Sequence, residues 1–228
     1  MQDTMELALA DPQVTADFRT FVVRARAADD DALRLQAVGN VLAAYVCVLR
    51  PKILGEDTPT VLGLRTMPLA VPAELDTTVS LASAADRLAR MSGQTLFPVP
   101  PMTVRDTWTG ITSPRSGWQP RGTVSFTVLE QAAHRGIREV AALVPQSPGA
   151  AVVQNARGAV WGRPIPGLEP VVPAGAAFAA MTLGFLSGTP AAAAAGPGPD
   201  EARLFSNGRW TRLSTPRGHV LVRPAAVL

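Results

Sequence analysis

Apolar residues recur at the three- and four-residue spacing of a helix in several stretches of the chain, and the longest of these runs from residue 127 to 144. Thr127 and Glu130 stand at the spacing of an N-terminal capping box, and Pro145 follows the last apolar position. Residues 80–93 predict another helix, with Ser80 as its cap and Gly93 just beyond its end. Both should be amphipathic helices that bury one face.

The N-terminal part is expected to be rich in helix. Thr15 can cap a helix that ends at the acidic residues 29–31, and residues 35–49 fit a second helix, although Val46 to Val48 fit a strand equally well. Further helices are expected near residues 151–157 and over residues 174–186. Residues 170–199 carry no charge, but prolines interrupt them and alanine dominates, so we expect a buried helix there and no membrane span.

Strand signals dominate residues 202–223, where Asn207-Gly208 and the TPRG turn divide three short alternating runs. A two-residue turn at Asn207-Gly208 pairs Phe205 with Trp210, and the second turn pairs Ser214 with His219. One face of this meander is then aliphatic and packs on a core; it comprises Ala202, Leu204, Thr211, Leu213, Val220 and Val222. Two shorter strands are expected over residues 60–70 and 76–79.

Together these elements predict an α+β protein with a helix-rich N-terminal part, a central amphipathic helix and a C-terminal three-stranded antiparallel meander, all sharing one core. Residues 1–187 would form a mixed main domain, and residues 188–200, GTPAAAAAGPGPD, a low-complexity linker. The meander, residues 201–228, should pack on the main domain, because three short strands bury too little to be stable alone.

Charge changes this picture only through its distribution. The sequence pI is 9.9, but a formal net charge of +3 is too diffuse to bind a polyanion strongly. Residues 3–31 carry three arginines against seven carboxylates, which gives −4, whereas residues 202–223 carry five arginines and no carboxylate, which gives +5. The scarcity of lysine beside abundant arginine, alanine and proline is typical of high-GC bacterial genomes. The acidic N-terminus lacks the features of a signal peptide and predicts a cytoplasmic protein.

The second face of the meander combines cations with aromatic rings. It carries Arg203, Phe205, Trp210, Arg212 and Arg223. The arginines can lie flat over the rings and cover them, which is a structural role. The same side chains can also bind an acidic partner, or single-stranded nucleic acid if bases stack on the two rings.

A further candidate surface is the segment from Arg105 to Gly122, which shows no helical or strand period. Its two tryptophans indicate an ordered loop, pinned by the indoles to the core or to the arginine-rich face of the meander. Long ordered loops also carry binding residues. As a binding surface the segment offers Arg105, Trp108, Arg115, Trp118 and Arg121.

Catalytic chemistry has little support in the sequence. The two histidines lack metal-ligand spacing, Cys47 stands in an apolar run, and there is no phosphate-binding loop, dinucleotide-binding motif or nucleophile elbow. We therefore expect a non-enzymatic binding protein without a metal ion or cofactor. Its partner would be an acidic protein or a second copy of the chain.

Two alternatives stay open at the level of sequence. The first is a protein that binds single-stranded nucleic acid through Phe205 and Trp210. The second is a hydrolase with an acid near Asp106, paired with Glu130 or Glu169.

Overall fold

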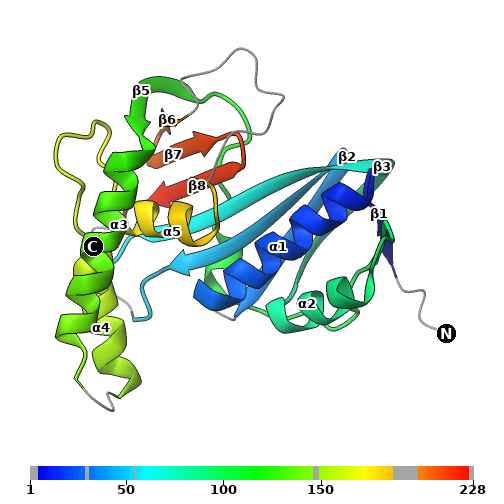
Figure 1. Cartoon of the computed structure of the whole chain (residues 1–228), viewed down its shortest axis with the longest axis horizontal. Helices are drawn as coiled ribbons and strands as arrows, with labels where there is room; N and C mark the ends of the chain where they lie inside the picture. Colours follow the sequence, from blue (N-terminus) through cyan, green and yellow to red (C-terminus); the bar gives the residue numbers. More distant parts are fainter. Residues whose placement is uncertain (1–4, 29–30, 54, 146–148, 187–199, 226–228) are drawn as a thin grey trace. The chain divides into compact units, whose positions relative to one another are not determined.

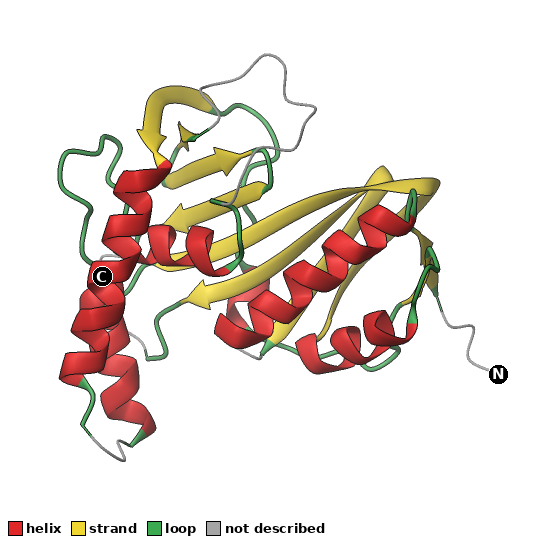
Figure 2. Cartoon of the chain, viewed as in Figure 1, coloured by secondary structure: helices red, strands yellow, loops and turns green. Residues whose placement is uncertain are grey.

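A computed structural model describes residues 5–28, 31–53, 55–145, 149–186 and 200–225. The chain forms two compact units, each assembled from two separate segments: unit 1 from Met1–Cys47 and Leu64–Thr112, and unit 2 from Val48–Gly63 and Ser113–Leu228. Both units combine helices with antiparallel strands (Figure 2), in line with the predicted α+β class. The range expected to be one main domain, 1–187, is thus shared between the units. Of the expected linker, 188–200, all but Asp200 lies outside the described residues.

Unit 1 packs two helices against strands. Along the chain it holds β1 (Glu6–Ala8), α1 (Pro12–Ala28), most of β2 (Ala32–Leu49) and β3 (Thr60–Ser80), α2 (Leu81–Arg90), β4 (Leu96–Pro98) and a 3₁₀ turn (Thr107–Gly110). Helices α1 and α2 lie side by side along the ribbon of β2 and β3 (Figure 1). Strand β1 pairs with β4, and the rings of Phe18 and Phe97 meet edge to face in the core, 5.2 Å apart.

Strand β2 replaces the second predicted N-terminal helix, which is wrong. The most deeply buried positions are odd-numbered up to Ala37 and even-numbered from Leu42 onward. Between them Gly39 has a φ of +56°, and an inserted residue in this conformation shifts the alternation of a strand by one position. The two phases together place apolar residues at spacings that imitate a helix. The expected short strand at 76–79 is part of β3.

The helices of unit 1 begin at different caps. Helix α2 has the predicted cap, because the Ser80 hydroxyl accepts a hydrogen bond from the Ser83 backbone N–H at 3.1 Å. Helix α1 is capped by Asp11 and not, as predicted, by Thr15. Thr15 is buried one turn further on and donates to the Gln94 carbonyl at 2.9 Å, so its hydroxyl makes a tertiary contact.

Unit 2 sets three helices against a sheet. It contains β5 (Gln119–Ser125), α3 (Phe126–Leu143), α4 (Ala150–Trp161), α5 (Ala174–Thr182), β6 (Glu201–Asn207), β7 (Trp210–Thr215) and β8 (Gly218–Arg223). With β2 and β3 the strands stand in the order β2, β3, β8, β7, β6, β5. Helix α3 packs on α4 and α5, and α5 also contacts β8 (Figure 1). No helix among the described residues is long and apolar enough to cross a membrane.

The central helix α3 is continuous, as the sequence predicts, but its cap is not the predicted one. Ser125 precedes the helix, and its hydroxyl accepts from the Val128 backbone N–H at 3.4 Å. The capping box of Thr127 and Glu130 is therefore wrong, since both residues already lie within the first turn.

Close packing explains the glycine in the middle of α3. A Cβ atom at Gly136 would stand 2.1 Å from Cζ3 of Trp161, at the end of α4. The Trp161 ring is itself buried and stacks on Phe178 of α5, with ring centroids 4.4 Å apart. One missing side chain on α3 thus lets three helices meet.

The meander is present, and its second hairpin has the predicted register, with Ser214 opposite His219. In the first hairpin the predicted register is wrong, because Asn207 pairs with Trp210 and the turn falls on Gly208 and Arg209. The Asn207 side chain donates to the Ser116 carbonyl at 2.8 Å, and this contact holds Asn207 as the last residue of β6.

The aliphatic face of the meander is unaffected by that difference. Moving the turn by one residue changes the partner of each β6 residue by two positions along β7. Residues two positions apart point to the same face of a strand, so each side chain keeps its face. Leu204, Leu213, Val220 and Val222 are all buried, as predicted. They form the part of the core that lies beneath the helices.

One carboxylate organises the connection between β2 and β3. Glu56 accepts hydrogen bonds from the backbone N–H groups of Lys52, at 2.7 Å, and Ile53, at 3.4 Å, and from the Thr58 hydroxyl. Burial alone would raise the pKa of Glu56, but these hydrogen bonds to the charged form outweigh it and lower the pKa below its ordinary 4.5.

Glu56→Gln is expected to reduce the free energy of unfolding at neutral pH and to change it little in acid. Because the folded-state pKa is lowered, the stabilisation exists above the pKa of the unfolded chain and is lost as pH falls through the folded pKa. Urea unfolding of both proteins from about pH 3 to pH 7 tests this, and the two curves should converge below about pH 4. If the free energies of unfolding of the two proteins differed by the same amount at every pH, the effect would come from the shape of the side chain and not from its charge.

Candidate binding face of unit 2

The arginine-rich face of the meander is built around one arginine. Arg212 on β7 stands opposite Phe205 on β6, so the two side chains share this face. The Arg212 guanidinium lies 4.5 Å from the centre of the Phe205 ring and 4.6 Å from that of Trp118, which comes just before β5. We call this arrangement of Trp118, Arg212 and Phe205 the Arg212 stack.

A closed loop carries Trp118 to the sheet. The Trp118 indole N–H donates to the Pro114 carbonyl at 3.1 Å, which closes the loop on itself. Asn207 at the end of β6 donates to the Ser116 carbonyl, and Gly117 takes a φ of +74° where a side chain would meet the Asn207 amide. Residues 114–118 are thus an ordered loop pinned by Trp118 to the arginine-rich face, which agrees with the predicted pinning for one of the two indoles.

The arginines around the stack differ in exposure. Arg203 and Arg115 are exposed, Arg223 is half-buried, and Arg121 is exposed but donates to the Ser206 hydroxyl at 2.7 Å. Arg121 sits at an irregularity in the pairing of β5 with β6. The end of the predicted loop, from residue 119 on, is therefore an edge strand.

The two rings proposed to stack nucleic-acid bases are already in use. Trp210 is only 7% exposed, and the Phe205 ring is covered on one side by the Arg212 guanidinium. A base could stack on Trp210 only if that ring left its buried position. The stacking alternative remains a prediction, and the packing of both rings fits the structural role of the arginines.

Arg105 and Trp108, the other two predicted binding residues, belong to unit 1. Arg105 is exposed, whereas Trp108 is 2% exposed and lies in the 3₁₀ turn. The turn is held by Arg34, which donates to the Thr109 carbonyl at 2.7 Å and forms a two-point ion pair with Asp76 at 2.9 Å. The two tryptophans of the segment therefore serve different units.

The pKa values of Arg34 and Arg212 are shifted in opposite directions. The hydrogen-bonded Asp76 carboxylate raises the pKa of Arg34. Burial lowers the pKa of Arg212, because the guanidinium loses water and gains no carboxylate. Among the described residues, Arg212 forms no hydrogen bond or ion pair, and its Nε is buried without a partner.

The acids of the hydrolase alternative belong to different units. Asp106 is half-buried at the start of the 3₁₀ turn in unit 1, while Glu130 and Glu169 are exposed in unit 2. His134 is exposed on α3. His219 has its Nδ1 2.9 Å from the Ser214 hydroxyl, on the sheet row next to the Arg212 stack. Within the described ranges, no three His, Cys, Asp or Glu side chains are grouped to hold a metal ion.

The residues that order this face carry no local signal for that role in the sequence. Asn207, Ser206 and Pro114 fix the loop and the strand edge through hydrogen bonds to partners far away in the chain. The sequence predicts that Asn207 is a turn residue, since asparagine before glycine is the usual sign of a hairpin turn. Only a contact between loop and strand distinguishes the two roles.

Family models cover both parts of the chain. Residues 113–227, half of the sequence, match a family described as a domain of unknown function (DUF8185), and residues 2–110 match another domain of unknown function (DUF8010). No curated protein matches the chain.

Solved structures with a similar fold are DNA polymerase III beta subunits. A protein from Eubacterium rectale assigned to this class has a TM-score of 0.53 at 7% identity. The Caulobacter crescentus pol III beta has a TM-score of 0.52, and a DNA polymerase sliding clamp from the same organism 0.50, both at 9% identity. Each comparison covers 98% of this chain and 66% of the solved one. At such identities the likeness shows the fold alone.

Proposed function

The chain belongs to the DUF8185 family, and we propose that it is a clamp-like, non-enzymatic protein that binds DNA through the arginines of unit 2. The observation that carries this proposal is the likeness to sliding clamps, which extends over 98% of the chain. The phosphate backbone of DNA would then take the place of the acidic protein that the sequence predicts as partner. The match covers 66% of the solved Eubacterium rectale chain, and we propose that a closed ring would consist of more than one copy of this protein.

The charge of the two units supports a division of roles. Unit 2 contains 13 arginines and lysines against 7 aspartates and glutamates, which gives +6, whereas unit 1 contains 8 against 11, which gives −3. A polyanion is attracted to the first and repelled by the second. The opposite signs also favour self-association of unit 2 of one copy with unit 1 of another.

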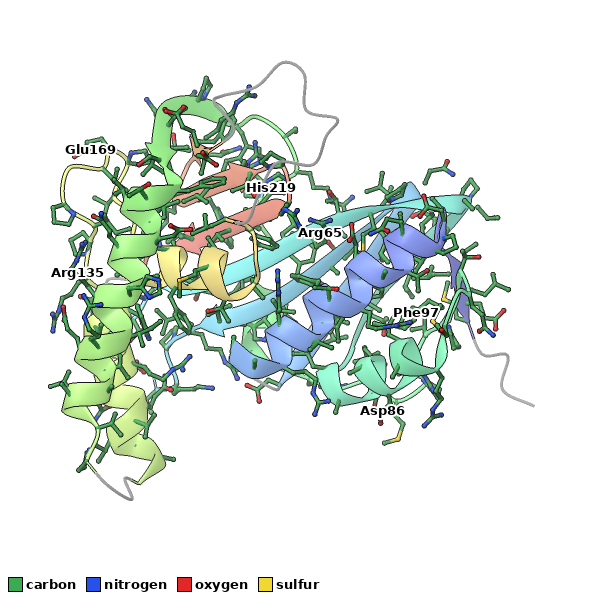
Figure 3. The ribbon with its side chains drawn as sticks, viewed as in Figure 1. Arg65, Asp86, Phe97, Arg135, Glu169 and His219 are labelled. Carbon is green, nitrogen blue, oxygen red and sulfur yellow. The ribbon has the colours of Figure 1, made fainter. Side chains whose placement is uncertain are left out.

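Helix α3 offers two exposed cations of unit 2. One side of the helix packs on α5, and Arg135 and Arg138 are exposed on the remaining surface. Figure 3 shows Arg135 projecting from α3 on the side away from β7 and β8. Neither arginine is stacked on a ring, so both can reach a phosphate without disturbing the core.

The test is a binding titration with labelled duplex DNA at about 50, 100 and 200 mM salt. We expect log K to fall linearly with log salt, and Arg135→Ala/Arg138→Ala to reduce the slope by about 2, since each phosphate contact contributes about 0.9. Arg90→Ala/Arg105→Ala, which removes two exposed arginines from unit 1, is the matched control. Absence of binding at 50 mM salt, or equal losses in both double variants, would contradict the proposal.

Closure around DNA is tested separately. A ring that encloses DNA is retained on a closed circle and slides off a linear fragment of the same sequence, whereas a surface contact releases both alike. We expect retention on the circle, together with a mass in solution above that of one chain. Equal release from both DNAs would leave DNA binding intact and remove the clamp.

A further inference from the structure

The Arg212 stack is an incomplete ion pair. A half-buried guanidinium loses much of its hydration, and folded proteins usually compensate by placing a carboxylate beside it. Arg34 shows this solution within the same chain, since Asp76 meets it at two points. Arg212 has only the π faces of Trp118 and Phe205.

The surroundings do not supply the missing charge. The segments that build this face, residues 113–125 and 201–225, carry seven arginines and one carboxylate, that of Glu201. Glu201 stands two residues before Arg203 at the start of β6, and it pairs across the sheet with Ser125. A concentration of cations of this kind raises the cost of holding Arg212 in place and increases its attraction for an external anion.

The stack leaves one part of Arg212 available. The rings of Trp118 and Phe205 lie against the guanidinium, and its Nε is buried, but its terminal nitrogens are not among the buried atoms that lack a partner. These nitrogens donate in the plane of the group, in the fork that matches the two oxygens of a carboxylate. The hydrogen bonds of Trp118 and Asn207 hold the loop in position, so little freedom is lost when an anion binds.

We propose that the Arg212 stack binds a side-chain carboxylate in an acidic segment of a partner protein. A protein segment fits better than nucleic acid, because the rings that could stack a base already stack the guanidinium. The contact is also one deeply set fork and not a row of exposed cations, as a phosphate backbone requires. This inference is independent of DNA binding, which we assign to α3.

Fluorescence polarisation with labelled twelve-residue peptides tests the proposal. The probe alternates glutamate with alanine and leucine, and its control has glutamine at every glutamate position. We expect the acidic peptide to bind at about 50 mM salt and the amide peptide not to bind. Arg212→Gln should lower the affinity for the acidic peptide about tenfold or more. Arg212→Lys should lower it nearly as much, because lysine keeps the charge and loses the two-pronged geometry of the guanidinium.

Arg115→Gln is the matched control, since it removes one exposed charge from the same loop. It should lower the affinity for the acidic peptide by no more than about threefold, which is the effect expected for a charge at the rim of a binding site. Equal weakening by Arg115→Gln and Arg212→Gln would reduce the site to general electrostatic attraction and overturn the proposal. So would equal binding of the acidic and amide peptides.

Two further measurements keep the outcome clear. If Arg212→Gln lowers the melting temperature, Trp118→Leu replaces it as the test, because it retains the cation and removes one ring; it should also weaken the acidic peptide. Duplex and single-stranded DNA are titrated on the same variants, and their binding should not depend on Arg212. Loss of DNA binding in Arg212→Gln with no effect on the peptide would reassign the stack to nucleic acid.

Discussion

Gly136→Ala is expected to lower the free energy of unfolding by up to about 2 kcal/mol, although alanine is the better helix former. The propensity gain is about 1 kcal/mol. Against it stands a methyl group 2.1 Å from a ring carbon of Trp161, and overpacking of this kind typically costs about 1–3 kcal/mol or more. Trp161 is buried and stacked on Phe178, so moving away from the methyl group would disturb that contact. Urea unfolding followed by circular dichroism measures the change.

A double variant separates packing from a backbone effect. In Trp161→Leu the ring is gone, so the added methyl group of Gly136→Ala has room, and the second substitution should be neutral or stabilising in that background. Gly110→Ala serves as control, since nothing lies within 4 Å of its Cβ position. If Gly136→Ala costs the same with and without the Trp161 ring, the explanation by packing is wrong.

Trp108→Ala is expected to have the largest effect on unit 1, a loss of about 3–5 kcal/mol, because it empties the space of a large side chain that is 2% exposed. The 3₁₀ turn that carries Trp108 would remain tied by Arg34 to Thr109, so collapse into the cavity is limited. Thermal and urea unfolding measure the loss.

Trp108→Phe gives a sharper test of the same site. The Trp108 indole N–H is buried and has no partner among the described residues, so phenylalanine removes an unsatisfied donor and keeps much of the ring. We expect a loss of only about 1–2 kcal/mol. At Trp118 the same substitution also breaks the bond to the Pro114 carbonyl. A loss in Trp108→Phe as large as in Trp108→Ala would point to a hydrogen bond that the packing does not show.

Elements determined by local signals could be predicted from the sequence. Helix α2 carries its cap and its apolar stripe within a few residues, and the aliphatic face of the meander follows from alternation alone. The predictions for β2 and for the turn at Asn207 failed for a common reason. In both, a local preference is outweighed. In β2 the change of phase at Gly39 makes the apolar spacing look helical, and at Asn207 the contact with the segment at Ser116 outweighs the preference for a turn.

The candidate site was predicted as a set of residues but not as a geometry. Arg212, Phe205 and Trp118 were all named from the sequence, yet their stacking depends on a loop closing over the sheet and on a register that differs from the expected one. The segment from Arg105 to Gly122 was treated as one surface. It crosses from unit 1 to unit 2 at Thr112, so its two tryptophans could not form one site by sequence proximity alone.

Strands β2 and β3 have a consequence for how the chain folds and how it can be divided. Unit 2 takes residues 48–63 from a part of the sequence far from its other residues, 113–228, and β3 stands next to β8. The sheet of unit 2 therefore pairs strands that lie far apart in the sequence, and such distant pairing folds slowly. A fragment that starts at Ser113 would leave β8 with a bare, apolar edge open to other chains. Cutting the protein where its sequence families meet would separate strands that its fold keeps together.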